Sequence, residues 1–570
     1  MTLYPAPRHL EHLGGSASYD VIAVARDATL PAQGYELVAT SDGTTIRHRD
    51  ELGLRYAQHT LAQLVAGGDR RSVRILDHPE FAQRGLMLDV SRDRVPTNET
   101  LAWLVDVLAD LRYNHLELYV EHTFAYAGHE EVWGGASPLT AEDLALLDGR
   151  CADAGITLVA NQNTFGHMER WLRHESHRWR AECPDGAISP FTGRSIPPAT
   201  LAPTPANAAF AVELVRELAG HVQSPMVNIG ADEPFELGQC ASAGDVAARG
   251  RAAVYLEHLN RIIRPLLADG HHVLFWGDVL RRHPELVPRL PEEEATAVVW
   301  CYEAPSDDPS MATLLGPELL ETMGLPDDFH LGFVAHARSY ASAGYPFWVA
   351  PGTSSWNTLI GRWSNARANL LDAAVTGRTL GAGGYLVTDW GDNGHLQPLT
   401  VSLLPLAYGA GVAWCADTHV EADVTGVVDR LAGIEGLGER LESLGDAHAL
   451  SGVTSVNGSS LFAALDPARP LPLFGRGDPG RLAATVALLD GSLGWLQALP
   501  PSTHREGLLA AVRLARHGAW RLAPRAGAPA PDGPSMAADV AECLELQRTA
   551  WLATSRPGGL EQSLRHLPNA

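Results

Sequence analysis

The stretch Pro225–Glu233, PMVNIGADE, is a short apolar run that ends in two adjacent carboxylates, Asp232 and Glu233. A run of this length beside a glycine is typical of a buried strand. Carboxylates at the end of a buried strand are costly unless they are paired or serve a function. The stretch therefore predicts a core strand that delivers two acidic side chains to a site. A salt-bridged strand end is the alternative.

Similar apolar runs occur on both sides of this strand and alternate with amphipathic helical patterns. Together they predict eight strands, at residues 84–90, 115–120, 156–161, 226–230, 273–276, 297–302, 347–350 and 385–388. Eight strands separated by helices over roughly 335 residues predict a (β/α)8 TIM barrel, an α/β fold. A doubly wound sheet would need a Gly-rich phosphate loop after an early strand, and the sequence shows none.

The regions that flank the barrel differ from it in pattern. Residues 1–80 predict a small α/β domain, with strands at 19–25 and 35–39 and a helix at 54–64. Residues 421–570 are rich in Leu, Ala and Arg at helical spacing, which predicts a helical C-terminal domain. The barrel then spans residues 81–420.

The composition is that of a globular protein: 570 residues, 45% hydrophobic and 19% charged. A net charge of -24, from 43 basic and 67 acidic residues, argues against nucleic acid and anionic membranes as partners. The chain contains no lysine, which excludes Schiff-base and pyridoxal-phosphate chemistry.

Neither the cysteines nor the N-terminus indicates a metal site or secretion. The six cysteines form no CxxC or zinc-ligand pattern, so we expect buried free thiols and no metal. The sequence MTLYPAPRHLEHLGG lacks the features of a secretory signal, which favours a cytoplasmic location. The uncharged stretch at 397–415 contains prolines and glycines, which suits a core segment better than a membrane span.

In a (β/α)8 barrel the active site lies at the carboxyl ends of the strands. Polar and aromatic residues follow every predicted strand: Asp89 and Arg92; Glu121 and His122; Asn161, Asn163 and His167; Asp232 and Glu233; Trp276 and Asp278; Trp300, Tyr302 and Glu303; Trp356 and Asn357; Asp389, Trp390, Asp392 and Asn393. Tryptophans among carboxylates and amides suit a neutral sugar, because indole stacks on pyranose C–H groups. Acidic residues without metal-ligand spacing favour proton transfer at a glycosidic bond, and no cofactor is expected.

The adjacency of the two carboxylates restricts the mechanism. An ordinary retaining glycosidase places its two carboxylates about 5 Å apart across the bond. Neighbouring residues on one strand instead tend to point apart. A substrate that supplies its own nucleophile removes this difficulty.

Several motifs resemble glycoside hydrolase family 20, the β-N-acetylhexosaminidases, and most closely its intracellular bacterial N-acetylglucosaminidase branch. They are RGLMLDVSRDRVP from Arg84, NIGADE from Asn228, VLFWGD from Val273 and GYLVTDWGDNGH from Gly384. The segment from Gly34 to Leu64 is similar to the small N-terminal α/β domain of that family. The resemblance covers about residues 34 to 415 and implies no cofactor.

The resemblance implies roles for individual residues. Glu233 would be the general acid and then the general base. Asp232 would orient the 2-acetamido group, whose carbonyl oxygen attacks C1 and forms an oxazolinium intermediate. Arg84 matches the arginine that binds sugar hydroxyls 3 and 4, and Asp389 matches the acidic residue that holds hydroxyls 4 and 6.

Further residues complete the implied site. His167 resembles a histidine that contacts the catalytic glutamate, with Glu121 as its partner, and a core histidine is the alternative. The implied aromatic cage consists of Trp276, Trp300 and Trp390, and the other substrate-binding candidates are Asn163, Asp278, Tyr302, Trp356 and Asn357.

Two departures from the family pattern stand out. The family form HxGxDE has a histidine where this chain has Asn228. The family tyrosine that donates to the acetamido oxygen has no clear match, and Trp356, Asn357 and Tyr302 are the candidates.

We therefore expect a cytoplasmic exo-β-N-acetylhexosaminidase that acts on small glycans and prefers N-acetylglucosamine. The alternatives are a non-catalytic sugar-binding protein, an ordinary retaining β-glycosidase and, more remotely, a metal-dependent barrel hydrolase. The choice between gluco and galacto sugars and between monomer and homodimer stays open.

Overall fold

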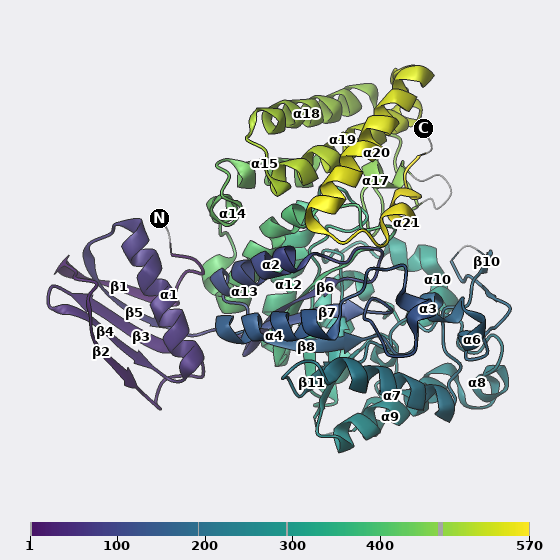
Figure 1. Cartoon of the computed structure of the whole chain (residues 1–570), viewed down its shortest axis with the longest axis horizontal. Coiled ribbons are helices and arrows are strands. Elements are labelled where there is room, and N and C mark those ends of the chain that lie inside the picture. The colour runs from purple at the N-terminus through teal and green to yellow at the C-terminus, as the bar shows by residue number, and fades with distance from the viewer. Residues whose placement is uncertain (1–2, 192, 292–293, 466–470, 569–570) are drawn as a thin grey trace.

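The computed structural model describes residues 3–191, 193–291, 294–465 and 471–568. An N-terminal sheet lies on one side of a central barrel, and a group of C-terminal helices lies on another (Figure 1).

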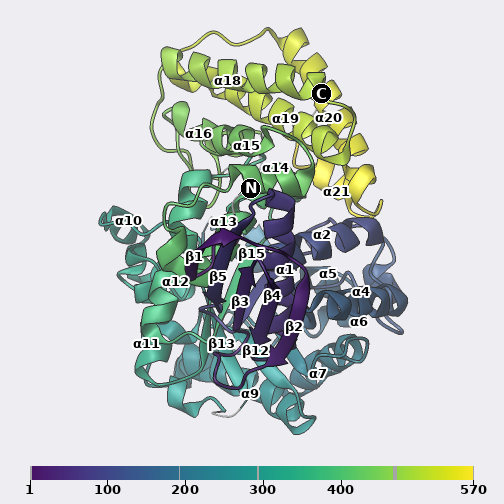
Figure 2. The same ribbon diagram turned by 90° about the vertical axis from the view of Figure 1, so that its left-hand side faces the viewer.

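The N-terminal domain is a five-stranded sheet in the order β1-β5-β3-β4-β2 with helix α1 packed on it (Figure 2). Its elements are β1 (His9–Ser16), β2 (Val21–Arg26), β3 (Tyr35–Thr40), β4 (Gly43–His48), α1 (Glu51–Gly67) and β5 (Arg71–Asp77). The sequence predicted β2, β3 and α1 and missed the other three strands. Trp414 of the barrel is part of this domain's core, so the domain is packed firmly on the barrel.

Eight parallel strands close the central barrel in the order β11-β12-β13-β14-β15-β6-β7-β8. They are β6 (Gln83–Asp89), β7 (His115–Val120), β8 (Thr157–Gln162), β11 (Met226–Asn228), β12 (His272–Trp276), β13 (Ala295–Trp300), β14 (Phe347–Ala350) and β15 (Gly384–Asp389). Every predicted strand is present within a few residues of its expected bounds, so the prediction of a (β/α)8 barrel is confirmed.

Helices and short irregular elements connect the strands. They are α2 (Asn98–Asp110), α3 (Glu130–Trp133), α4 (Ala141–Ala154), α5 (Glu169–Leu172), α6 (Glu175–Arg178), the short strands β9 (Ala187–Ile188) and β10 (Ser195–Ile196), α7 (Pro205–Ala219), α8 (Ala243–Arg249), α9 (Arg251–Ala268), the 3-10 helices η1 (Leu280–Arg282) and η2 (Val287–Arg289), α10 (Ser310–Thr322), η3 (Phe329–Leu331), α11 (Phe333–Ser342), α12 (Trp363–Leu380), η4 (Leu399–Ser402) and α13 (Leu403–His419). Thr140 and Asp143 form a capping box at the start of α4, which fixes the position of this helix.

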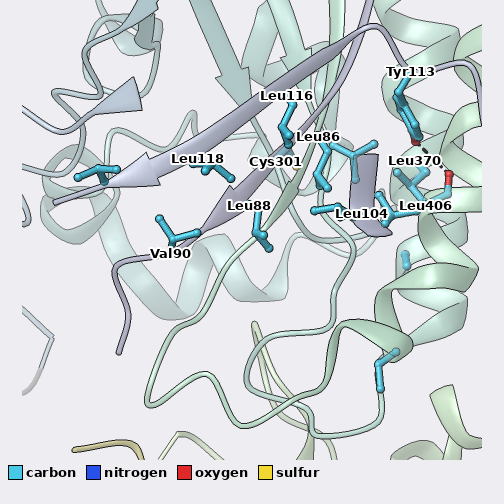
Figure 3. Packing of buried hydrophobic residues seen from close by; sticks show 14 of the residues in the cluster. Leu86, Leu88, Val90, Leu104, Tyr113, Leu116, Leu118, Cys301, Leu370 and Leu406 are labelled. Atoms are coloured by element: carbon cyan, nitrogen blue, oxygen red, sulfur yellow. Dashed lines mark hydrogen bonds between the residues drawn. The ribbon is translucent and has the colours of Figure 1, made fainter. Parts of the chain in front are cut away.

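The barrel strands alternate between an outer and an inner face. Leu86 and Leu88 of β6 pack outward in the same cluster as Leu104 of α2 (Figure 3). Nearby, the Tyr113 hydroxyl donates to the carbonyl of Leu406 in α13 at 3.0 Å. This packing buries the outer face of the strands under the helices, while the inner face points toward the barrel axis.

A polar cluster lies inside the barrel below the predicted site. Glu117 of β7 is fully buried and accepts hydrogen bonds from Asn161 at 2.7 Å and Asn228 at 2.9 Å. Its other oxygen lies 2.7 Å from Nε2 of His115. Asn228, which stands where the family has histidine, therefore satisfies a buried carboxylate and ties β11 to β7.

Within the described residues after 420, all the regular elements are helices, and they pack above the barrel (Figure 1). Its helices are α14 (Thr425–Ala432), α15 (Leu437–Gly445), α16 (Ala447–Leu450), α17 (Ser460–Ala463), α18 (Pro479–Ala498), α19 (Thr503–Ala526), α20 (Gly533–Thr554) and α21 (Leu560–Leu564).

Leu399–His419 is the one helical stretch in the described part of the chain that is long and apolar enough to cross a membrane. Within the protein 94% of its most apolar window is buried, so its apolar residues form part of the core.

The prediction of six free thiols is wrong for two of them. Cys183 and Cys240 form a disulfide, and Cys151, Cys301, Cys415 and Cys543 are free and buried. The two partners are 57 residues apart, in the loops that follow β8 and β11, so only the tertiary structure brings them together.

Candidate active site

The chain turns sharply after β11, and this turn presents the two carboxylates. Gly230, Ala231 and Glu233 have positive φ angles of 62°, 67° and 46°. A Cβ on Gly230 would lie 2.9 Å from the side chain of Asn163, so this position requires glycine. The Tyr255 hydroxyl donates to the Ala231 carbonyl at 3.0 Å and helps to fix the turn.

This turn brings Asp232 and Glu233 to the same histidine. Nε2 of His167 lies 3.4 Å from Oδ2 of Asp232 and 3.4 Å from Oε2 of Glu233. Consecutive residues of a regular strand would point to opposite faces. The left-handed turn overrides that rule, so both acids reach one site, and His167 lies in contact with Glu233 as predicted.

Hydrogen bonds and charge fix the state of Asp232. Nδ2 of Asn163 donates to Oδ1 of Asp232 at 2.7 Å. Burial by itself raises the pKa of Asp232, but the adjacent His167 and the other polar neighbours hold that pKa below its ordinary value. Burial likewise opposes the charge on His167, and Asp232 raises the pKa of His167 well above its ordinary value. The pair is therefore an aspartate facing an imidazolium.

Arg92, rather than Arg84, is the arginine of the site, which corrects the sequence-based assignment. Arg84 lies near the amino end of β6, is 1% exposed, and donates to the carbonyls of Phe81 and Arg112. The active site lies at the opposite end of the strands. Arg84 therefore stabilises the packing at the amino ends of the strands and cannot contact a sugar at the carboxyl ends.

Arg92 follows the carboxyl end of β6 and is held on several sides. It donates to Asp89 at 2.9 Å and forms an ion pair with Glu121 at 3.2 Å. Its guanidinium lies 4.9 Å from the ring centres of both Tyr119 and Trp390. Glu121 thus contacts Arg92 directly, and Arg92 lies 3.5 Å from Nδ1 of His167.

Aromatic side chains from four strands gather inside the mouth of the barrel. Trp276 and Trp390 have ring centres 5.8 Å apart, and Trp300 stacks on Tyr302 at 5.3 Å. The indole N–H of Trp390 donates to the Tyr302 hydroxyl at 2.9 Å. Trp356 packs edge-on against Tyr302 at 5.1 Å. The structure therefore brings the predicted aromatic residues together.

Two acidic residues at the carboxyl end of β15 differ in their surroundings. Asp389 is 1% exposed and accepts a hydrogen bond from Thr353 at 2.7 Å, and burial raises its pKa to about 6. Asp392 is only partly buried and interacts electrostatically with Arg92 and Glu233. Asp392 is thus better placed than Asp389 to meet sugar hydroxyls.

Asp278 lies beside the carboxylate pair. It is 2% exposed, and its Oδ2 accepts the backbone N–H of Glu233 at 3.0 Å. Burial and then the charge of Asp232 raise the pKa of Asp278 to about 7. Asp278 therefore supports the backbone of Glu233.

The C-terminal region contributes to the site wall. Asn457 accepts the indole N–H of Trp356 at 3.0 Å, and its carbonyl accepts from Asn357 at 3.2 Å. Asn357 in turn accepts from Asn393 at 2.9 Å. Asn457 lies in the loop before α17, where no sequence motif pointed to the site.

His167, Asp232 and Glu233 also form the one group in the described part of the chain with three metal-ligand atoms close together, all within 4.8 Å. One imidazole and two carboxylates are a donor set that a divalent ion can use. The same three groups can instead share protons, so a metal requires a direct test.

Comparison with known proteins relates the chain to one family. Residues 4–78 match the family model "Glycosyl hydrolase family 20, domain 2". A β-N-acetylhexosaminidase of Cellulomonas fimi is 27% identical over 241 residues, which are 39% of this chain and 48% of that protein. A β-hexosaminidase of Akkermansia muciniphila is 26% identical over 251 residues, 40% of this chain and 50% of that protein. The matched region thus spans about half of each relative.

A solved structure shows the same fold. The family 20 exo-β-N-acetylglucosaminidase of Vibrio harveyi, in complex with N-acetylglucosamine, is 16% identical with a TM-score of 0.56 over 78% of each chain.

Proposed function

Because the chain is a relative of glycoside hydrolase family 20, we propose that it is a retaining exo-β-N-acetylhexosaminidase that uses the 2-acetamido group of its substrate as the nucleophile. The observation that carries this proposal is the contact of the adjacent Asp232 and Glu233 with one histidine, His167. Two acids on one turn are poorly placed to attack a sugar from opposite faces, and they suit a substrate that brings its own nucleophile.

In the first step the acetamido carbonyl oxygen bonds to C1 while the bond from C1 to the leaving oxygen breaks. Glu233 gives its proton to that oxygen. Asp232, held by Asn163 at 2.7 Å, accepts the amide N–H and stabilises the positive charge of the oxazolinium ring. Asp232 must be ionised to accept this N–H and to stabilise the positive charge. The lowered pKa of Asp232 favours that ionised form.

In the second step Glu233 takes a proton from water, and the water oxygen attacks C1. The bond between C1 and the acetamido oxygen breaks, so the amide is restored. Two displacements at C1 retain the β configuration. His167, in contact with both acids, keeps them oriented in both steps.

We further propose that the terminal sugar is N-acetylglucosamine in a small glycan. Support comes from the aromatic cluster, which suits a pyranose face, and from the relatives named as hexosaminidases. The cytoplasmic location remains a prediction, and the Cys183–Cys240 disulfide argues against it because disulfides are rare in the cytosol.

The test is release of nitrophenol from nitrophenyl β-N-acetylglucosaminide by the full chain. Glu233→Gln should lower kcat by about 10³-fold or more, since proton transfer alone is worth about 10²- to 10⁴-fold. Full activity in that variant would reject the assignment. A thiazoline analogue of the oxazolinium should inhibit the enzyme strongly, whereas indifference would favour an ordinary two-carboxylate glycosidase.

Two controls separate the other candidates. Activity that is lost in a chelator and restored by a divalent ion would identify a metal-dependent hydrolase built on His167, Asp232 and Glu233. Saturable binding of N-acetylglucosamine without hydrolysis of any glycoside would identify a sugar-binding protein.

A further inference from the structure

A groove on the outer wall of the barrel lies between α7 and α9, which pack side by side (Figure 1). Its volume is about 940 Å³. Small or apolar side chains form its floor, among them Ala208 and Val212 of α7 and Ala253 and Leu256 of α9. None of the residues that line it belongs to the candidate active site. The groove is therefore a surface that the proposed catalysis does not use.

The rim of this groove is rich in arginine. Five arginines and two glutamates line the groove, although the chain as a whole has a net charge of -24. One of the glutamates, Glu257, pairs with both Arg249 and Arg261. Arg264 and Arg289 are exposed and form no ion pair with any described residue. The Arg289 carbonyl accepts from Asn260 of α9, so both unpaired arginines lie toward the C-terminal end of α9. This end of the groove therefore favours an acidic partner.

Helix α4 carries a surface that matches the groove. Leu146 is 62% exposed and is among the most exposed large apolar side chains in the described part of the chain. Glu142 and Asp153 lie about one turn before it and two turns after it, on the same face of the helix. Both acids are exposed, and neither forms an ion pair with a described residue. This face thus presents an apolar side chain between two unpaired acids.

The face and the groove also match in length. From Glu142 to Asp153 the face of α4 is about 16 Å long. The part of α9 that lines the groove, from Ala253 to Arg264, has the same spacing along its helix. An exposed leucine at the middle of the face can therefore cover the apolar floor while an acid reaches each end.

The order of the helices allows a two-fold axis to make this contact twice. Helices α4, α7 and α9 each run from the carboxyl end of one barrel strand to the amino end of the next, so they point the same way. Both α4 and α7 pack on β8, and α9 packs on the far side of α7. A two-fold axis parallel to α7 then places α4 of each copy over the groove of the other, with the helices running in one direction.

We propose that this face is the interface of a homodimer, in which α4 of each copy docks in the groove between α7 and α9 of its partner. Leu146 covers the alanine floor. Asp153, at the C-terminal end of α4, meets the end of the groove where Arg264 and Arg289 are unpaired. The negative end of the α4 helix dipole lies at the same place and adds to the attraction.

Sedimentation velocity of the full chain over a range of concentrations tests this interface. The wild type should form a dimer. Leu146→Arg places a charge against the apolar floor and beside other arginines, and it should weaken association by about tenfold or more. Because Leu146 is exposed in the single chain, its variant should keep the circular dichroism spectrum of the wild type.

Charge exchange tests the predicted pairing of Asp153 with Arg264. Asp153→Arg and Arg264→Glu should each weaken association, because each sets like charges against one another. The chain that carries both changes should associate more tightly than either single variant, since the pair is restored with its signs reversed. Glu439→Arg on the exposed face of α15 is the matched control, with the same change of charge away from this interface, and should leave association unchanged.

A wild type that stays monomeric at every concentration would overturn the proposal. A dimer that Leu146→Arg leaves intact would overturn it as well, and so would losses from Asp153→Arg and Arg264→Glu that simply add in the double variant. None of these results bears on the proposed catalytic function, because the interface lies outside the candidate active site.

Discussion

Asp278 accepts the backbone N–H of Glu233 at 3.0 Å and thereby holds the turn that presents the general acid. Glu233 has a φ of 46°, a conformation that costs a non-glycine residue on the order of 1–3 kcal/mol and persists only where its surroundings enforce it. The carboxylate of Asp278 supplies part of that enforcement.

Asp278→Ala should therefore lower kcat by about 10- to 100-fold, because a small displacement of the acid disrupts its alignment. Asp278→Asn keeps an oxygen acceptor and should restore most of this loss. Since the pKa of Asp278 is raised to about 7, the Asn variant should also lose the ionisation near neutral pH from its kcat profile. An Ala variant with wild-type kcat would exclude this positioning role.

Substitution of the two arginines of the RGLMLDVSR motif should change different properties: KM for Arg92 and the free energy of unfolding for Arg84. Arg92→Lys removes the guanidinium that lies over Tyr119 and Trp390, and we expect KM to rise by about tenfold or more because lysine lacks the planar fork. Arg84→Lys breaks buried hydrogen bonds at the bottom of the barrel and should instead lower the free energy of unfolding by several kcal/mol.

Denaturant unfolding and steady-state kinetics on both variants decide between these roles. If Arg84→Lys were fully stable but raised KM, and Arg92→Lys did neither, the original assignment of Arg84 would be correct.

Glu236 should make the protein less stable as the pH rises. It is 1% exposed and accepts the backbone N–H of Ala199 at 2.7 Å, and burial raises its pKa to about 7. The folded state therefore holds this proton more tightly than the unfolded chain. Its contribution to stability is complete below the unfolded pKa of 4.5 and is lost as the pH rises through 7.

The free energy of unfolding in urea at pH 5 and pH 8 measures this effect. Glu236→Gln should reduce the fall between these pH values by on the order of 2 kcal/mol. Glu142→Gln, at the exposed start of α4, is the control and should not change the fall. Identical falls in wild type and in Glu236→Gln would show that Glu236 does not titrate in this range.

The Cys183–Cys240 disulfide should stabilise the two loops that carry His167 and Glu233. Removing it with the double variant Cys183→Ser, Cys240→Ser should lower the free energy of unfolding by about 2–4 kcal/mol, because the unfolded chain gains freedom. A reducing agent should lower the Tm of the wild type to that of the variant and leave the variant unchanged. An equal response of both proteins would show that the bond does not form.

The sequence alone determined the barrel and its central pair of acids. A strand can be predicted from the apolar pattern of its own few residues, and all eight barrel strands lie within a few residues of the apolar runs that predicted them. Because barrel active sites lie at the carboxyl ends of the strands, the sequence also predicted that His167, Asn163 and the tryptophans lie in one site. The left-handed turn at Gly230 then brings the side chains of Asp232 and Glu233 to the same side, where both contact His167.

Only the tertiary structure decided which charged residues face the site. Arg84 lies near the amino end of β6 and Arg92 follows its carboxyl end. Only the folded chain shows that Arg84 is buried away from the site, while Arg92 contacts Asp89 and Glu121 within it. Asp389 and Asp392 both lie at the carboxyl end of β15 and differ in burial, which depends on the residues that pack around them. The Cys183–Cys240 disulfide joins segments that are far apart in the sequence, and Gln562, Arg565 and His566 line one cavity with His167. No local pattern encodes these arrangements, because they arise only when the chain packs.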